Sequence, residues 1–223
     1  MIKTFCLSAL CLILINGCQL FTIPEDADPL NELPMYGGQR EPYEKKRTGA
    51  SQKCVEDGWD CLYSKKEPRN AMMNFNRAWM YDPDNPKAYL GMGIIVGIEA
   101  EGIDDPAQRM EKIDRSIKLI EKAQSLDNAD TSVMTSLAKA YMDKACRLND
   151  KAEKDKYLKK SEELFITTSK LSPKGATYFN WSVCLYHQER YDEAWKMLLK
   201  ANEMNYRTPP GYLSSLRNKL DKQ

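Results

Sequence analysis

Small, aromatic and proline residues recur at fixed helical spacings, and this spacing constrains the fold more than any other feature of the sequence. Ala71, Phe75, Ala78 and Pro83 follow one another at intervals of four, three and five residues. Residues three or four apart share one face of an α-helix, so the two alanines let a second helix approach and Phe75 fills the space between them. Pro83 lacks an amide hydrogen and disfavours helix at the preceding residue. The stretch therefore predicts a closely packed helix that ends at Pro83.

The same pattern recurs on both sides of this helix. The run "DPDNP" (82–86) predicts a turn and then a new helix, with Pro86 in its first turn. After residue 50 the chain divides into four units, each made of a first and a second helix. The first helices carry Val55, Gly58, Trp59 and Leu62; Tyr89, Met92, Gly93 and Val96; Met134, Leu137, Ala138 and Tyr141; and Tyr178, Trp181, Ser182 and Leu185. The second helices of the last three units carry Ser116, Ile120 and Ala123; Ser161, Phe165, Thr168 and Pro173; and Ala194, Leu198 and Ala201.

The run "FNRAWMYDPDNPKAYLGMGIIV" (75–96) resembles the boundary between two tetratricopeptide repeats (TPRs), and "RYDEAW" (190–195) resembles the turn inside one. The resemblance implies an all-α fold, a right-handed TPR-type helical solenoid of about four helix pairs over residues 51–208. Solenoids need a capping element at each end. Apolar residues three and four apart predict such a helix over residues 209–223; they are Tyr212, Leu213, Leu216 and Leu220.

The units depart from the 34-residue TPR length at three places. The second and third units contain about 11 additional residues each, in the segments 99–112 and 146–156. We expect these insertions to project as turns from one edge of the solenoid, although the second could instead lengthen its two helices. The first unit has one additional residue in "SKKEPRN" (64–70).

The N-terminal residues 1–17 have the layout of an export signal. Lys3 precedes an apolar core over 5–15, which is shorter than the roughly 20 residues of a membrane-spanning helix. "INGC" (15–18) resembles the lipobox of bacterial lipoproteins, which implies cleavage before Cys18 and attachment of lipid, including palmitate, to that cysteine. Gln19 in place of aspartate favours the outer membrane of a Gram-negative bacterium, with the domain facing the periplasm or the cell surface. An ordinary secretory signal with a chance cysteine is the alternative.

Residues 18–50 predict a flexible tether that follows the lipidated Cys18. Prolines recur through this segment, "MYGG" (35–38) adds two glycines, and charged residues are dense. Such a composition buries too little apolar surface to offset the entropy of ordering the chain. The alternative is that Met35, Tyr36 and Tyr43 dock on the domain or on a partner.

The TPR resemblance also implies a partner-binding groove, because the first helices of a TPR stack line its concave face. The family's groove positions fall in this chain on Lys87, Leu90, Ile94, Ile98, Thr135, Lys139, Met142, Phe179, Val183, Tyr186 and His187, with Glu56, Asp60 and Tyr63 in the first unit. This mixed apolar and charged surface suits a peptide or a segment of a protein. The alternative is that several of these side chains pack only against neighbouring helices or the tether.

The sequence predicts no catalytic residue, metal site, cofactor or small-molecule substrate. It has a single histidine, His187, and none of the nucleotide-binding, zinc-binding or hydrolase motifs. The formal net charge is +1, with 33 basic and 32 acidic residues, so no basic surface indicates nucleic acid. Cys54 and Cys61 lie too far apart on one helix for a disulfide. We expect the cysteines after Cys18 to act as small buried apolar residues, although disulfides remain possible for an exported protein.

These observations predict a non-catalytic protein-binding scaffold or adaptor, anchored to the bacterial outer membrane through lipid and bound to an envelope protein. The alternative is a pilotin-like assembly factor for an outer-membrane secretin, or a regulator of cell-wall hydrolases.

Overall fold

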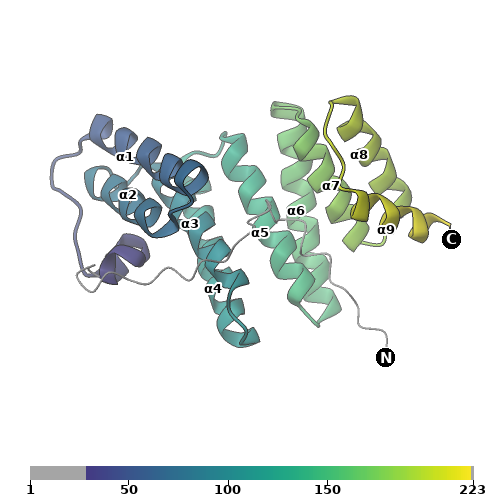
Figure 1. Cartoon of the computed structure of the whole chain (residues 1–223), viewed down its shortest axis with the longest axis horizontal. Coiled ribbons are helices and arrows are strands. Elements are labelled where there is room, and N and C mark those ends of the chain that lie inside the picture. The colour runs from purple at the N-terminus through teal and green to yellow at the C-terminus, as the bar shows by residue number, and fades with distance from the viewer. Residues whose placement is uncertain (1–28, 222–223) are drawn as a thin grey trace. The chain divides into compact units, whose positions relative to one another are not determined.

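A computed structural model describes residues 29–221, and within this range it contains only helices, turns and loops (Figure 1). Residues 1–28, with the predicted signal peptide and Cys18, lie outside the described residues. The all-α prediction is confirmed. The α-helices are α1 (Thr48–Asp60), α2 (Pro68–Tyr81), α3 (Pro86–Glu101), α4 (Pro106–Leu126), α5 (Thr131–Arg147), α6 (Lys151–Leu171), α7 (Gly175–His187), α8 (Tyr191–Glu203) and α9 (Pro210–Leu220).

The helix starts follow from local sequence. Proline is the first residue of α2, α3, α4 and α9, where the missing amide hydrogen costs nothing. Asn85, Asp105 and Asp150 precede α3, α4 and α6, and each side chain accepts a hydrogen bond from an amide in the first turn, at 2.9, 2.8 and 2.7 Å. These bonds satisfy amides that the helix itself leaves unpaired.

The helices form two compact units that divide within α5, between Ser136 and Leu137. In the first unit α1 packs on α2, α2 on α3, and α3 on α4. Phe75 of α2 is fully buried at the centre of the first three helices. A Cβ atom added to Gly58 of α1 or Gly91 of α3 would lie 2.8 or 2.4 Å from the Phe75 ring, so both glycines are needed for this close approach.

The second unit contains α6 to α9 and the part of α5 that follows Leu137. Phe165, Leu158, Leu185 and Leu198 form its core, together with smaller residues of α5 and α7. Tyr212 and Leu216 of α9 are fully buried in the same cluster. The predicted C-terminal helix is therefore present and covers apolar residues of the preceding helix pair.

A buried serine joins the two helices of all four pairs, and in the first pair Ser51 of α1 donates to the carbonyl oxygen of Ala78 in α2 at 2.8 Å. Ser116 of α4 donates to the carbonyl oxygen of Gly93 in α3 at 2.7 Å, and Ser161 of α6 donates to that of Ala138 in α5 at 2.8 Å. In the last pair the direction is reversed, since Ser182 of α7 donates to the carbonyl oxygen of Ala194 in α8 at 2.7 Å.

The additional residues of the second and third helix pairs form helix rather than projecting turns. α4 and α6 each have 21 residues, whereas α7 and α8 have 13. Only residues 102–105 and 148–150 connect the paired helices, so no long turn projects from 99–112, and the alternative expectation of longer helices describes 146–156. The additional residue of the first helix pair lies in a π-helical turn over Cys61–Lys65. This turn ends at Lys66, which has a left-handed backbone conformation. Among residues 29–221, no helix is long and apolar enough to cross a membrane.

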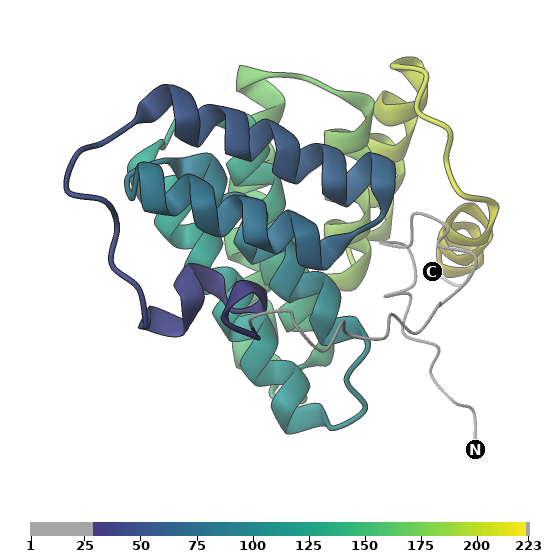
Figure 2. The ribbon, with the colours of Figure 1, turned by 60° about the vertical axis from the view of Figure 1, so that its left-hand side comes forward.

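Residues 29–47 lie against α2, whereas a flexible tether was predicted over 18–50. The segment begins with short 3₁₀ turns over Pro29–Glu32 and Pro34–Gly38, and Tyr36 is only 3% exposed. Figure 2 shows it along the outer side of the α1–α2 pair. The alternative expectation, docking of Tyr36 and Tyr43 on the domain, describes this part of the chain. We call residues 29–47 the strap.

Candidate partner-binding surface

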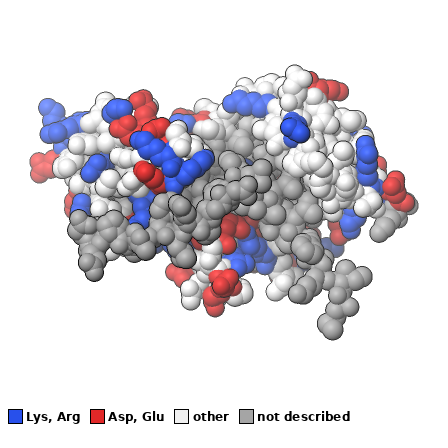
Figure 3. All heavy atoms as spheres, viewed as in Figure 1, with Lys and Arg blue, Asp and Glu red and all other residues white. Residues whose placement is uncertain are grey.

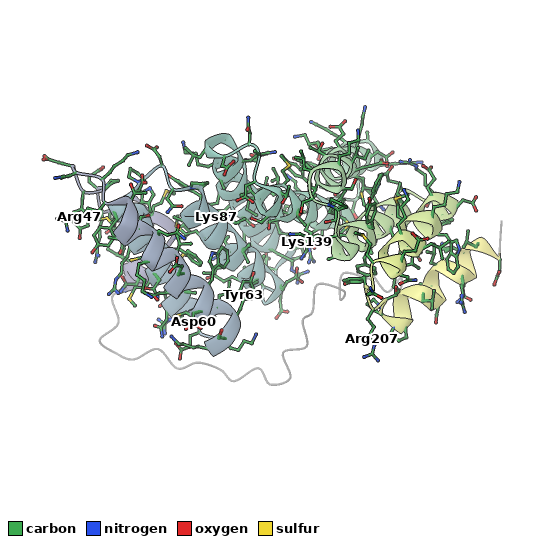
Figure 4. The ribbon with its side chains drawn as sticks, turned by 90° about the horizontal axis from the view of Figure 1, so that it is seen from above. Arg47, Asp60, Tyr63, Lys87, Lys139 and Arg207 are labelled. Carbon is green, nitrogen blue, oxygen red and sulfur yellow. The ribbon has the colours of Figure 1, made fainter. Side chains whose placement is uncertain are left out.

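Some of the predicted groove residues on α3 and at the end of α1 are apolar and reach the surface. Tyr63 and Ile98 are exposed, by 48% and 46%, and Ile94 is half-buried. Tyr63 lies in the π-helical turn that continues α1, and Ile98 lies in the second half of α3, which packs against α1. Trp59 stacks on Tyr63 with a ring separation of 5.7 Å. We call Trp59, Tyr63, Ile94 and Ile98 the α1–α3 patch, because they lie on two helices that pack together and on the turn after α1; Figure 4 labels Tyr63.

The charged groove residue of α3, Lys87, is engaged within the first unit (Figure 4). Its ammonium group forms an ion pair with Asp130 and a 3.0 Å hydrogen bond with Ser132. Asp130 also accepts the Ser132 amide at 2.7 Å, at the start of α5. Burial raises the pKa of the Asp130 carboxyl, but hydrogen bonds from Lys87 and Ser132 outweigh that effect and lower it to about 2. Lys87 therefore fixes the start of α5. Thr135, another predicted groove residue, lies on α5 and is half-buried.

Four predicted groove residues are buried and cannot contact a partner as expected. Leu90, Met142, Phe179 and Val183 are all less than a tenth exposed. Phe179 explains the result in the second unit, because Tyr206 stacks on its ring at 4.8 Å and Tyr212 of α9 contacts its edge at 5.4 Å. Met142 and Val183 belong to the same core cluster. The burial of these four side chains agrees with the alternative expectation, packing within the fold.

The remaining groove residues of the second unit are half-buried. They are Lys139, Tyr186 and His187. The Tyr186 ring contacts Tyr191, Tyr212 and His187 edge to face, at 5.4, 5.8 and 5.7 Å.

His187 lines an open cleft of about 610 Å³ at the connection between α5 and α6 and the end of α7. Lys151, Lys154, Asp155 and Glu189 also line this cleft. Burial, with a smaller contribution from the positive charge of Lys154, lowers the pKa of His187 to about 4. The imidazole is therefore neutral at pH 7.

No two cysteines of the described residues form a disulfide. Cys61 and Cys184 are buried, as expected for small apolar residues, and Cys54 and Cys146 are half-buried. Burial raises the pKa of the Cys184 thiol to about 11. Within residues 29–221, no group of three His, Cys, Asp or Glu side chains is arranged to hold a metal ion. Lys, Arg, Asp and Glu side chains are interspersed over the face drawn in Figure 3.

Sequence reasoning missed Asn76, a fully buried asparagine in the middle of α2. Its amide contacts only main-chain atoms of the strap: Oδ1 accepts the Met35 amide at 2.7 Å, and Nδ2 donates to the carbonyl oxygens of Asn31 and Leu33 at 3.2 and 2.9 Å. An amide on the apolar side of a helix requires such partners, because an unpaired buried polar group is costly. The position of Asn76 on the apolar side of α2 was the signal in the sequence that could have predicted these contacts.

Comparison with known proteins places the chain by its fold. No family model matches the sequence, and no curated protein matches it. Among solved structures, the thermophilic TPR protein TTC0263 of Thermus thermophilus superimposes with a TM-score of 0.57 at 15% identity, over 70% of this chain and 74% of that one. The chain has the fold of a TPR protein. MamA superimposes with a TM-score of 0.50 at 17% identity, over 70% and 78% of the two chains. Both likenesses concern the fold alone.

Proposed function

We propose that this TPR-fold chain is a non-catalytic scaffold that binds a protein or peptide partner and is held at the bacterial outer membrane by lipid on Cys18. The exposed α1–α3 patch carries the binding part of the proposal. Ile98 of α3 and Tyr63 of the turn after α1 are both exposed there, and the patch also includes the half-buried Ile94 and the Trp59 ring stacked on Tyr63. Aromatic and aliphatic anchors of this kind suit the apolar side chains of a bound peptide.

A matched pair of substitutions tests the binding surface. Ile98 and Leu199 are almost equally exposed, by 46% and 45%, but Leu199 lies on α8, away from the predicted groove positions. We expect Ile98→Glu to reduce capture of the partner from detergent-solubilised envelope at least tenfold, and Leu199→Glu to leave it unchanged. Equal capture by both variants would overturn the assignment of this surface.

The captured protein distinguishes the roles that a scaffold can have. A cell-wall hydrolase, or several envelope proteins, favours an adaptor, whereas a single secretin favours the pilotin-like alternative. Both roles use the same surface, so the identity of the partner decides between them and the Ile98 variant serves as the control in each case.

Attachment through Cys18 needs its own test. Two or three acyl chains give lasting membrane binding, at about 0.8 kcal/mol for each buried CH₂. We expect the wild-type chain to lose residues 1–17, gain the mass of the lipid and sediment with the outer membrane, and Cys18→Ser to do none of these. Two soluble, equally cleaved proteins would instead indicate an ordinary export signal.

A further inference from the structure

The strap follows α2 along the whole length of the helix. Glu32 forms an ion pair with Arg69 in the first turn of α2, and Asn76 holds the residues from Asn31 to Met35 at its middle. At the end of the helix, the amides of Tyr43 and Arg47 donate to the carbonyl oxygens of Met80 and Tyr81, both at 2.9 Å. Carbonyls in the last turn of a helix have no partner within the helix, so the strap supplies them.

The side chains of the strap add contacts at the same end. The Tyr43 ring lies 5.3 Å from the Tyr81 ring, and Lys46 forms ion pairs with Asp82 and Asp84. Arg40 lies 4.2 Å above the ring of the buried Tyr36. The described contacts of the strap are thus with α2 and the turn that follows it.

The strap also contains an unfavourable backbone conformation. Met35, Tyr36, Gly37 and Gly38 all have positive φ, between 52° and 76°. Glycine adopts these values freely, but side-chain-bearing residues rarely do, least of all in succession. Such a turn persists only while surrounding contacts hold it, and the three hydrogen bonds of Asn76 are among those contacts.

We propose that α2 carries a peptide-recognition surface of its own, which reads the main chain through Asn76, and that its ligand is the strap, bound and released as a unit while the rest of the domain stays folded. All three hydrogen bonds of Asn76 are to main-chain groups of the strap, so recognition depends on backbone geometry. The strap buries only Pro34 and Tyr36, which makes it the part of the first unit with the least to lose on opening.

Release of the strap would change how far the domain can lie from its attachment, a consequence that rests on the proposed lipid at Cys18. With the strap bound, ten residues (19–28) separate Cys18 from the domain and can span at most about 35 Å. With the strap released, 29 residues (19–47) separate them and can span about 100 Å. Asn76 would therefore set the reach of the anchored scaffold.

Amide hydrogen exchange on the full chain tests the binding of the strap. We expect Asn76→Ala to accelerate exchange at Met35, Tyr43 and Arg47 at least tenfold, with no change at the buried amides of α3. Asn76→Asp keeps an acceptor for the Met35 amide but loses the donor, and should accelerate exchange similarly. Asn70→Ala, an exposed asparagine on the same helix, should change nothing at the strap.

Two outcomes of this experiment would overturn the proposal. Unchanged exchange in Asn76→Ala would mean that Asn76 does not hold the strap, and equal acceleration in α3 would mean that the strap opens only with the whole unit. The distance between the domain and the membrane is tested separately, by energy transfer from a membrane dye to a label on the domain. Asn76→Ala should increase this distance and so reduce the energy transfer. If the wild-type chain is not membrane-attached, the proposed anchor fails while the exchange result still decides the strap.

Discussion

The ring of Phe75 in α2 occupies the space that any side chain on Gly91 of α3 would need. A Cβ atom at position 91 would lie 2.4 Å from ring carbons of Phe75, a separation that real side chains do not tolerate. Phe75 is fully buried and has Gly58 of α1 on another side, so the ring has no free space to move into. Three helices are therefore fixed around one aromatic side chain.

Gly91→Ala should destabilise the protein by about 1–3 kcal/mol, the usual cost of overpacking a well-packed core. Urea unfolding followed by circular dichroism measures the change. Gly49→Ala is the control, because a Cβ atom at position 49 of α1 meets no atom within 4 Å. We expect its effect to stay within about 0.5 kcal/mol. Equal stability of the two variants would contradict the close approach of α2 and α3.

Ser116→Ala and Ser161→Ala should each reduce the free energy of unfolding by about 1 kcal/mol. Each substitution removes a buried hydrogen bond between the two helices of a pair. Ser125→Ala removes only an exposed bond to Lys122 within α4, so its effect in the same unfolding experiment should be close to zero. Alanine is a better helix former than serine, so helix propensity cannot explain a loss at either position. A loss for Ser125→Ala as large as for Ser116→Ala would therefore contradict the importance of the bond between helices.

Asp130→Ala should cost about 1–3 kcal/mol at pH 7, because it removes both the first-turn hydrogen bonds of α5 and the ion pair with Lys87. The carboxyl has a pKa of about 2 in the folded chain against an ordinary value of 3.8. A lowered carboxyl pKa stabilises the fold above pH 3.8, and this contribution is lost as the pH falls towards 2. The difference between wild type and variant should therefore shrink over that range, as measured by urea unfolding at several pH values. A constant difference would contradict the ion pair.

His187 should make the folded chain less stable in mild acid. Its pKa is 6.5 in the ordinary case and about 4 in the fold, so above pH 6.5 both folded and unfolded chains hold neutral imidazole. As the pH falls from 6.5 to 4, only the unfolded chain takes up the proton, and stability falls by up to about 3 kcal/mol.

Two variants isolate this effect of His187. His187→Gln removes the titration and should flatten the dependence of stability on pH between 6.5 and 4. Lys154→Gln removes the smaller, Coulombic cause and should weaken the dependence without abolishing it. Chemical unfolding at pH 7 and pH 4.5 measures both. A wild-type chain whose stability does not change between these values would rule out the buried neutral imidazole.

The helix pairs were predictable from sequence because the residues that set them are local and repeated. Ala71, Phe75 and Ala78 report a close helix contact by their spacing alone, and Pro86 and Asp105 mark helix starts by their own chemistry. The length of α4 and α6 was less evident. Projecting turns were expected in both inserted segments, with longer helices as an alternative only for 146–156, but most residues of 99–112 and 146–156 are helical.

The partner surface was only partly predictable. Position within a repeat says which way a side chain points, but not what lies in front of it. Phe179 occupies a groove position and is nevertheless buried, because Tyr206 and Tyr212 arrive from a later part of the chain. The strap was harder still, since Asn76 recognises carbonyl and amide groups that every residue possesses, and its left-handed turn includes Met35 and Tyr36, for which sequence gives no such signal.

The reversed serine of the last helix pair bears on how such a chain diverges. In α3–α4 the hydroxyl comes from the second helix, and in α7–α8 it comes from the first, yet both bonds are 2.7 Å long and join the same two backbones. Donor and acceptor can therefore trade sides without changing the geometry of the pair. A comparison that scores each alignment column separately counts such a trade as two mismatches, although the helices keep their bond. Repeats of this kind can thus lose sequence similarity while they keep structural similarity.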